Sequence, residues 1–213
     1  MKPFLAIIVA LSVAGLAKCA IIGRVVCDSS IAGDIYGFGA TPVNGTIADR
    51  ISFDVYQGSV VLVTNVASYN TRSTSGFLEL NDLMSQYASQ PFMVLAFPST
   101  QFNREVPESN DEMMDALFYV RPGNGFVPTF PVFQKTLVNG DGEDAFFTFI
   151  KSGCSYTEEE FNVDLEYSPM TVSDFRQPFE KILVGKDGKP YFRYHASVDV
   201  SVVIADIDAL LAA

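Results

Sequence analysis

The sequence predicts an α/β fold in which helices flank a central mixed sheet. Two buried strand patterns with a helical pattern between them predict a right-handed crossover unit, whose two strands are parallel. Near the C-terminus, a hairpin pattern followed by an amphipathic helix predicts antiparallel strands in the same sheet. Because both kinds of pairing are expected, the sheet is predicted to be mixed.

The crossover unit is predicted from residues 59–97. Ser59–Ser68 is a nearly continuous β-branched run, typical of a strand buried on both faces. The apolar residues of the next segment recur at three- and four-residue spacing, as on one helix face: Phe77, Leu80, Met84 and Tyr87. Pro91 then precedes Phe92–Phe97, a second buried strand pattern. Together they form one strand–helix–strand unit.

Shorter elements are predicted on either side of this unit. Residues 34–43 alternate apolar and small side chains ahead of Asn44-Gly45, which predicts a short hairpin. Ser109–Glu112 is a capping-box pattern, and we expect a helix to follow it at Met113. Asp144–Ile150 has the pattern of another helix.

The C-terminal part completes the predicted sheet. Lys181–Val184 and Tyr191–Tyr194 flank Asp187-Gly188, which is typical of a hairpin turn. Apolar residues spaced along residues 200–211 predict a final helix. A parallel crossover followed by a hairpin and a helix is the plan of the thioredoxin-like fold.

Length and composition indicate one globular domain. A chain of 213 residues that is 48% hydrophobic and 18% charged suffices for one buried core and is short for two. We therefore expect a domain over residues 21–213, after a leader at 1–20. The net charge is −11 at pH 7. A surface this acidic repels nucleic acid and anionic lipid, so neither is expected as a partner.

Residues 1–20 have the form of a secretory signal peptide. A positive start at Met1-Lys2 precedes an apolar run and the small residues that suit a signal peptidase, and we expect cleavage within 17–20. A membrane anchor is the alternative, but the run is shorter than the ~20 residues a spanning helix needs. We expect a secreted, extracellular protein. Loss of Lys2 and Lys18 leaves 12 of the 14 basic side chains against 25 acidic ones, a net charge of −13.

The cysteines fit an oxidising compartment. Cys19 lies in the expected cleavage region, so Cys27 and Cys154 are the pair that the mature chain keeps. Such a pair favours a structural disulfide. The alternative is a peroxidatic thiol at one of the two, which requires electropositive, partly exposed surroundings.

One N-glycosylation acceptor is present, Asn44-Gly45-Thr46. It lies beside Pro42 in turn-like surroundings, where the asparagine is expected to face solvent. In a secreted chain we expect a glycan on Asn44, with an unmodified turn as the alternative.

The junction of the first central strand and its helix should hold any reactive group. Amides at a helix N-terminus favour an anionic thiolate or selenolate, and here that junction is Asn65–Arg72. Five blocks resemble, in order, the signature blocks of glutathione peroxidases: Asn65–Tyr69, Glu79–Leu83, Leu95–Phe102, Tyr119–Pro128 and Phe179–Gly188. The resemblance spans roughly residues 27–211 and is closest to the secreted, plasma-type branch of that family.

The resemblance implies glutathione-dependent reduction of hydroperoxides, a reaction of the oxidative stress response. A selenocysteine or cysteine carries it, supported by a glutamine, a tryptophan and an asparagine. Asn70 stands at the selenocysteine position, Gln101 keeps the glutamine, and Gln177 and Pro178 replace the other two. An amide does not pass through a sulfenic-type oxidation state, and Pro178 has no N–H to donate. The family reaction therefore lacks an electron carrier here.

The remaining site predictions also come from the resemblance. Arg193 lies where the family carries arginines that attract glutathione carboxylates; the alternative is a strand residue that points to solvent. We interpret His195, the single histidine, as a structural or surface residue. No metal site is indicated, and no cofactor is expected apart from glutathione as a possible co-substrate. The loop corresponding to Gly123–Gly125 lies at a subunit contact in tetrameric members, which implies a homotetramer, with a dimer as the alternative.

Two functional hypotheses follow. The first is a secreted pseudoenzyme that keeps the peroxidase scaffold for a binding or structural role toward an unidentified extracellular ligand. The second is a weak peroxidase that uses a free Cys27 or Cys154. Titration of free thiols distinguishes them, because a disulfide between the two leaves neither available.

Overall fold

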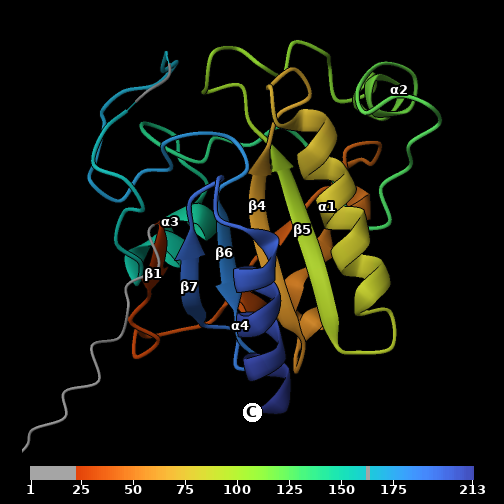
Figure 1. Ribbon diagram of the computed structural model, residues 1–213. Helices are drawn as coiled ribbons and strands as arrows, with labels where there is room; N and C mark the ends of the chain where they lie inside the picture. Colours follow the sequence, from red (N-terminus) through yellow and green to blue (C-terminus); the bar gives the residue numbers. More distant parts are fainter. Residues whose placement is uncertain (1–22, 162–163) are drawn as a thin grey trace, which may run out of the picture.

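A five-stranded mixed sheet forms the centre of the computed structural model, which describes residues 23–161 and 164–213 (Figure 1). Its strands along the chain are β1 (Arg24–Val26), β4 (Val60–Val66), β5 (Phe92–Pro98), β6 (Lys181–Val184) and β7 (Pro190–Tyr194). Their order across the sheet is β1-β7-β6-β4-β5. Only β4 and β5 pair in parallel, and the other three pairs are antiparallel. The predicted mixed sheet and both of its pairings are confirmed.

The β-branched sequence of β4 explains its central place. All seven of its residues are buried, because β5 and β6 flank it and other elements cover both sheet faces. The parallel register runs from Val60 opposite Phe92 to Val66 opposite Pro98. Both strands therefore end together, and the segments that follow them start from one edge of the sheet.

Helices cover both faces of the sheet. The longer ones are α1 (Ser73–Gln86), α3 (Ala145–Ser152) and α4 (Val200–Ala212), all predicted from sequence. The cluster under α1 and α4 includes Phe77 and Ile207, and the cluster under α3 is rich in phenylalanine. Figure 1 shows α1 and α4 in front of the strands and α3 behind them. Each fully buried large apolar side chain contributes about 1.5–3 kcal/mol, so both layers hold the sheet.

The helix predicted after Ser109–Glu112 is present but short. The Ser109 backbone N–H and hydroxyl both donate to the Glu112 carboxylate, at 2.9 and 2.8 Å. α2 (Met113–Asp115) follows and continues as a π-helical turn at Ala116–Val120. The capping pattern thus indicated the start of this segment and not its length.

The tight hairpin predicted at residues 34–43 is wrong. β2 (Gly39–Ala40) pairs with β3 (Ile51–Ser52), so the connection is ten residues long rather than a two-residue turn at Asn44-Gly45. Asp49 accepts from the Thr46 backbone N–H at 2.8 Å, which stabilises a 3₁₀ turn within this connection. Local side-chain capping therefore competes with the expected strand. Further 3₁₀ turns lie at Ile35–Gly37 and Phe53–Tyr56.

The predicted leader, with Cys19, lies outside the described residues. Across residues 23–161 and 164–213, no helix combines the length and apolar character needed to cross a membrane.

Candidate functional site

Asn70 lies between the end of β4 and the start of α1. Its backbone carbonyl accepts from the Ser73 N–H at 3.0 Å and from the Ser73 hydroxyl at 2.7 Å. Its side-chain oxygen accepts from the Arg72 N–H at 2.8 Å. Asn70 therefore caps the turn that leads into α1, a role common for asparagine at such a position. Asn70 is half-buried, and it lies at the strand–helix junction where the sequence predicted a reactive group.

The remaining polar group of Asn70 binds a carboxylate. Its Nδ2 donates to Glu105 Oε2 at 2.7 Å, and Asn103 Nδ2 lies 3.4 Å from Glu105 Oε1. The backbone carbonyl of Glu105 accepts from the Tyr69 N–H at 2.9 Å. An anion beside the N-terminus of α1 is electrostatically favoured. Here the protein supplies that anion itself, as the half-buried side chain of Glu105.

Glu105 was not among the residues predicted for the site. It lies four residues after Gln101, in the loop that leaves β5 at the same sheet edge. An acidic residue close in sequence to a predicted site residue was the available signal. Its contact with Asn70 could not be read from sequence, because it depends on how the loop folds back.

Gln101 is buried and bonds to a different loop. Its Nε2 donates to the Asn139 carbonyl at 2.7 Å, and its Oε1 accepts from the Val138 and Asn139 N–H groups at 2.7 and 3.1 Å. In the described part of the chain, no hydrogen bond joins Gln101 to Asn70. Gln101 therefore fixes the 138–139 backbone.

Gln177 and Pro178 approach the junction from the segment before β6. Asn65, in β4, donates its Nδ2 to the Gln177 carbonyl at 3.0 Å, and its own carbonyl accepts from the Phe179 N–H at 2.7 Å. Pro178 is buried between these two links. The Gln177 side chain donates to Glu158 Oε1 at 2.9 Å and also contacts the His195 ring. Its amide is therefore directed to the 158 loop.

The 177–179 segment also packs on α1. Gly76 makes this possible, since a Cβ at that position would lie 2.6 Å from the Phe179 ring. Beneath the junction, Lys181 Nζ lies 3.2 Å from Glu79 Oε1 and ties β6 to α1. Burial lowers the pKa of Lys181, and the Glu79 carboxylate partly opposes that shift. The four predicted positions thus lie on segments that meet at one sheet edge, and within the described residues no hydrogen bond joins their side chains.

Comparisons with known proteins agree with this arrangement. The family model described as glutathione peroxidase matches residues 35–151, more than half of the chain. The chain is 43% identical to glutathione peroxidase 3 of Pongo pygmaeus over 183 residues, covering 85% of this chain and 80% of that protein. It is 41% identical to glutathione peroxidase 6 of Rattus norvegicus, over 86% of this chain and 83% of the relative.

The chain belongs to the glutathione peroxidase family.

Solved structures support the fold. The crystal structure of T. cruzi GPX1 superposes with a TM-score of 0.61 at 22% identity, covering 84% of this chain and 97% of that one. A DsbF homologue from Corynebacterium diphtheriae gives 0.53 at 14% identity, over 88% and 93% of the two chains. At these identities the likeness concerns the fold alone. The predicted thioredoxin-like fold is confirmed.

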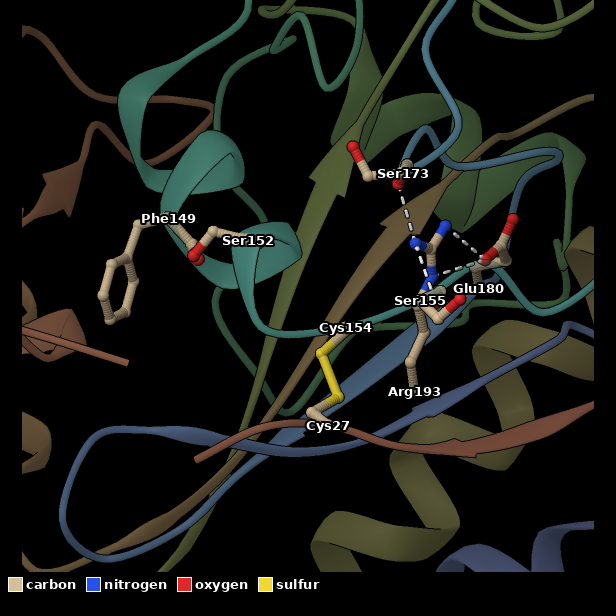
Figure 2. The surroundings of a disulfide bond; sticks show 8 residues. All are labelled: Cys27, Phe149, Ser152, Cys154, Ser155, Ser173, Glu180 and Arg193. Atoms are coloured by element: carbon tan, nitrogen blue, oxygen red, sulfur yellow. Dashed lines mark hydrogen bonds and ion pairs between the residues drawn. A yellow bond between two sulfur atoms is a disulfide. The ribbon is translucent and has the colours of Figure 1, made fainter. Parts of the chain in front are cut away.

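Arg193, the candidate glutathione-binding residue of this family member, is fully buried in β7. The alternative that it points to solvent is wrong. Its Nε and Nη2 donate to Glu180 Oε2 at 3.1 and 3.0 Å. Its Nη1 donates to the Ser173 and Ser155 carbonyls at 2.7 and 3.4 Å (Figure 2). Its Nη2 also donates to the Asp174 carbonyl at 2.8 Å. All five N–H donors thus bind the protein, an arrangement that does not support a glutathione contact.

The predicted disulfide between Cys27 and Cys154 is present, beside this buried ion pair (Figure 2). Both cysteines are buried, at 7% and 4% exposure. Cys154 precedes Ser155, whose carbonyl contacts Arg193. The disulfide therefore anchors the start of the 155–177 segment to the chain after β1.

Two further predicted positions are placed. Asn44 is exposed in a turn, which leaves its side chain accessible. His195 is half-buried, and its Nδ1 contacts the Ser197 hydroxyl at 2.6 Å. In the described part of the chain, no group of three or more His, Cys, Asp and Glu side chains is arranged to hold a metal ion.

Proposed function

We propose that this member of the glutathione peroxidase family is a secreted, catalytically impaired pseudoenzyme with a binding or structural role. The proposal rests mainly on what Asn70 is and what its side chain binds. An amide fills the position of the redox-active residue, and its donor is bound to Glu105 at 2.7 Å. Neither an amide nor a carboxylate can give two electrons to a hydroperoxide and then be re-reduced by a thiol.

The surroundings of Asn70 support the same conclusion. A peroxidase needs donors directed at the reacting chalcogen and its peroxide, because such groups stabilise the charge that develops there. Gln101 donates to the Asn139 carbonyl instead, and the Gln177 amide donates to Glu158. Pro178 has no donor to offer. The polar groups at these positions therefore stabilise the fold.

Secretion is supported by three independent features. The first 20 residues have the form of a signal peptide. The Cys27–Cys154 disulfide suits an oxidising compartment, and Asn44 is an exposed glycosylation acceptor. Digestion of the secreted protein with an N-glycosidase, compared with an Asn44→Gln variant, tests the glycan. A mobility shift that persists in the variant would refute modification at Asn44.

We further propose that the chain forms a homotetramer or a dimer through the segment around Gly123–Gly125. Tyr119, Val120 and Val127 are 74%, 57% and 56% exposed, and they lie close together in sequence in an otherwise acidic protein. Grouped exposed apolar side chains of this kind are typical of interaction sites.

The decisive experiment is steady-state reduction of hydrogen peroxide and of a lipid hydroperoxide by the purified secreted protein. Glutathione and thioredoxin are supplied separately as reductants. We expect no turnover above that of a heat-denatured sample. Turnover that disappears in a Cys27→Ser or Cys154→Ser variant would support the alternative, a weak peroxidase with a relocated active site. The disulfide argues against that alternative, because neither sulfur is a thiol.

A further inference from the structure

A small pocket lies beyond the carboxyl end of β5, apart from the Asn70 junction. Its volume is about 170 Å³, and its lining comes from residues 39–41, 134–136 and the start of α3. Phe97 and Phe146 also line it, and both are buried. None of the four peroxidase positions lines it. Ligands of open α/β sheets bind at the carboxyl ends of strands, so the location is suited to binding.

Arg50 is the unusual residue of this pocket. The described residues contain twelve Lys and Arg side chains, and ten of them bind a carboxylate or a carbonyl of the protein. The exceptions are Arg50 and Arg72, whose side chains have no hydrogen-bond or ion-pair partner in the described chain. Of these two, Arg50 lines the pocket. In a protein with a net charge of −11, an arginine without a carboxylate partner is a local exception.

The other polar groups of the pocket bind the protein. Asp144 Oδ1 accepts from the Phe146 N–H at 2.9 Å and caps α3. Gln134 Nε2 donates to the Gly45 carbonyl at 2.9 Å, and the Thr136 hydroxyl donates to the Gln134 carbonyl at 2.8 Å. Lys135 also lines the pocket, and its Nζ donates to the Val106 carbonyl at 3.3 Å. The Arg50 guanidinium is therefore the lining group that has all of its donors left for a ligand. Its planar fork matches a carboxylate.

The size and the charge of the pocket limit the class of ligand that it can bind. A pocket of about 170 Å³ is smaller than the roughly 300–1,000 Å³ of drug-sized sites, and it has room for a ligand the size of several waters. Arg50 and Lys135 bring two positive charges to the lining and Asp144 brings one negative charge, so the net charge is positive and balances one negative charge on a ligand. Phe97 and Phe146 expose only 1% and 2% of their surface, so the lining is mostly polar and suits a small carboxylate. We propose that this pocket binds a small organic monocarboxylate through Arg50.

The test is titration of the full secreted protein with benzoate, followed by amide and arginine-side-chain NMR shifts. We expect saturable shifts at Thr41, Thr136 and the Arg50 Nε–H. Arg50→Gln should weaken benzoate binding at least tenfold, and because Arg50 is exposed, the variant should fold normally. Arg72→Gln removes the other arginine without a partner and should leave the affinity unchanged. Benzamide, the neutral analogue, should produce no saturable shifts.

Several results would overturn the proposal. Equal affinity in the Arg50→Gln variant, or equal binding of benzamide, would show that Arg50 and a carboxylate do not define the site. Shifts that vanish with Arg72→Gln would place binding at the N-terminus of α1. Inorganic phosphate that binds more tightly than benzoate would contradict the preference for a single charge. In support of that preference, Asp144→Asn should strengthen phosphate binding.

Discussion

Replacement of Asn70 by cysteine should not produce a reactive thiolate, because Glu105 lies beside the introduced sulfur. Asn70 Nδ2 is 2.7 Å from Glu105 Oε2, and a cysteine Sγ occupies about the place of the amide carbon. The sulfur is then about 4 Å from a carboxylate that no longer has its amide partner. Thiolate and carboxylate repel each other, so the pKa of the thiol should rise.

The size of the effect follows from Coulomb's law. At about 4 Å, two charges interact with about 1 kcal/mol in bulk water and about 4 kcal/mol at the effective dielectric of a protein surface. These energies raise a thiol pKa of about 8.5 by roughly one to three units. The N-terminus of α1 opposes this with only about 0.3–1 kcal/mol. At the effective dielectric of a protein surface repulsion should therefore dominate, and after the helix contribution is subtracted the thiolate fraction at pH 7 should fall by up to about 500-fold.

The assay is the pH dependence of alkylation by iodoacetamide, read by mass spectrometry of the peptide that carries the introduced thiol. Asn70→Cys should titrate at least one unit above Asn70→Cys/Glu105→Gln, which removes the charge and keeps the shape. The unmodified protein is the control for alkylation at any other cysteine. Peroxidase turnover should stay low in both variants, since Gln177 and Pro178 offer the sulfur no donor.

Two results would refute this reasoning. A thiol pKa at or below about 8.5 in Asn70→Cys would show that the helix N-terminus outweighs Glu105. Equal pKa values in the single and double variants would show that Glu105 turns away once the Asn70 amide is gone. Substantial peroxidase turnover from Asn70→Cys alone would show that the changes at 177 and 178 matter little.

Three further predictions concern stability and assembly. The Cys27→Ser/Cys154→Ser variant opens a loop with a sequence separation of 127 and should lose about 4–5 kcal/mol in urea unfolding; a loss below about 1 kcal/mol would contradict this. Glu79→Gln strands the buried Lys181 ammonium and should cost about 2 kcal/mol, whereas Lys181→Met should stay within about 1 kcal/mol of the unmodified protein; the reverse order in urea unfolding would refute the assignment. Tyr119→Asp should dissociate the oligomer in light-scattering chromatography, and an unmodified protein that is already monomeric would exclude the proposed interface.

The elements that were predicted correctly have strong local patterns. The β-branched run of β4 and the spaced apolar residues of α1 determine a strand and a helix almost without tertiary context. β1 is different, because Arg24–Val26 is only three residues long and exists as a strand through its pairing with β7. The prediction of a tight turn at Asn44-Gly45 was wrong because a local 3₁₀ turn competes with the hairpin.

The sequence predicted where the site residues lie but not which groups their side chains bind. Sequence motifs placed Asn70 at the β4–α1 junction, and a motif match also selected Gln101 and Arg193. What each side chain binds depends on loops distant in sequence, such as the Asn139 carbonyl 38 residues from Gln101. Arg193 is buried because it pairs with Glu180, which lies thirteen residues earlier in the chain, directly before the adjacent strand β6. No local pattern encodes such pairs.

The same contacts explain how a peroxidase scaffold persists without a redox residue. Its stability resides in β4, β5 and the two covering layers, whereas the site positions lie on loops at the sheet edge. A polar group left unpaired in such a site costs about 1–3 kcal/mol when it is buried. Asn70, Gln101 and Gln177 avoid that cost by binding Glu105, Asn139 and Glu158. Restoring peroxidase chemistry would therefore require breaking contacts that now stabilise the fold, and a single substitution at Asn70 leaves most of them in place.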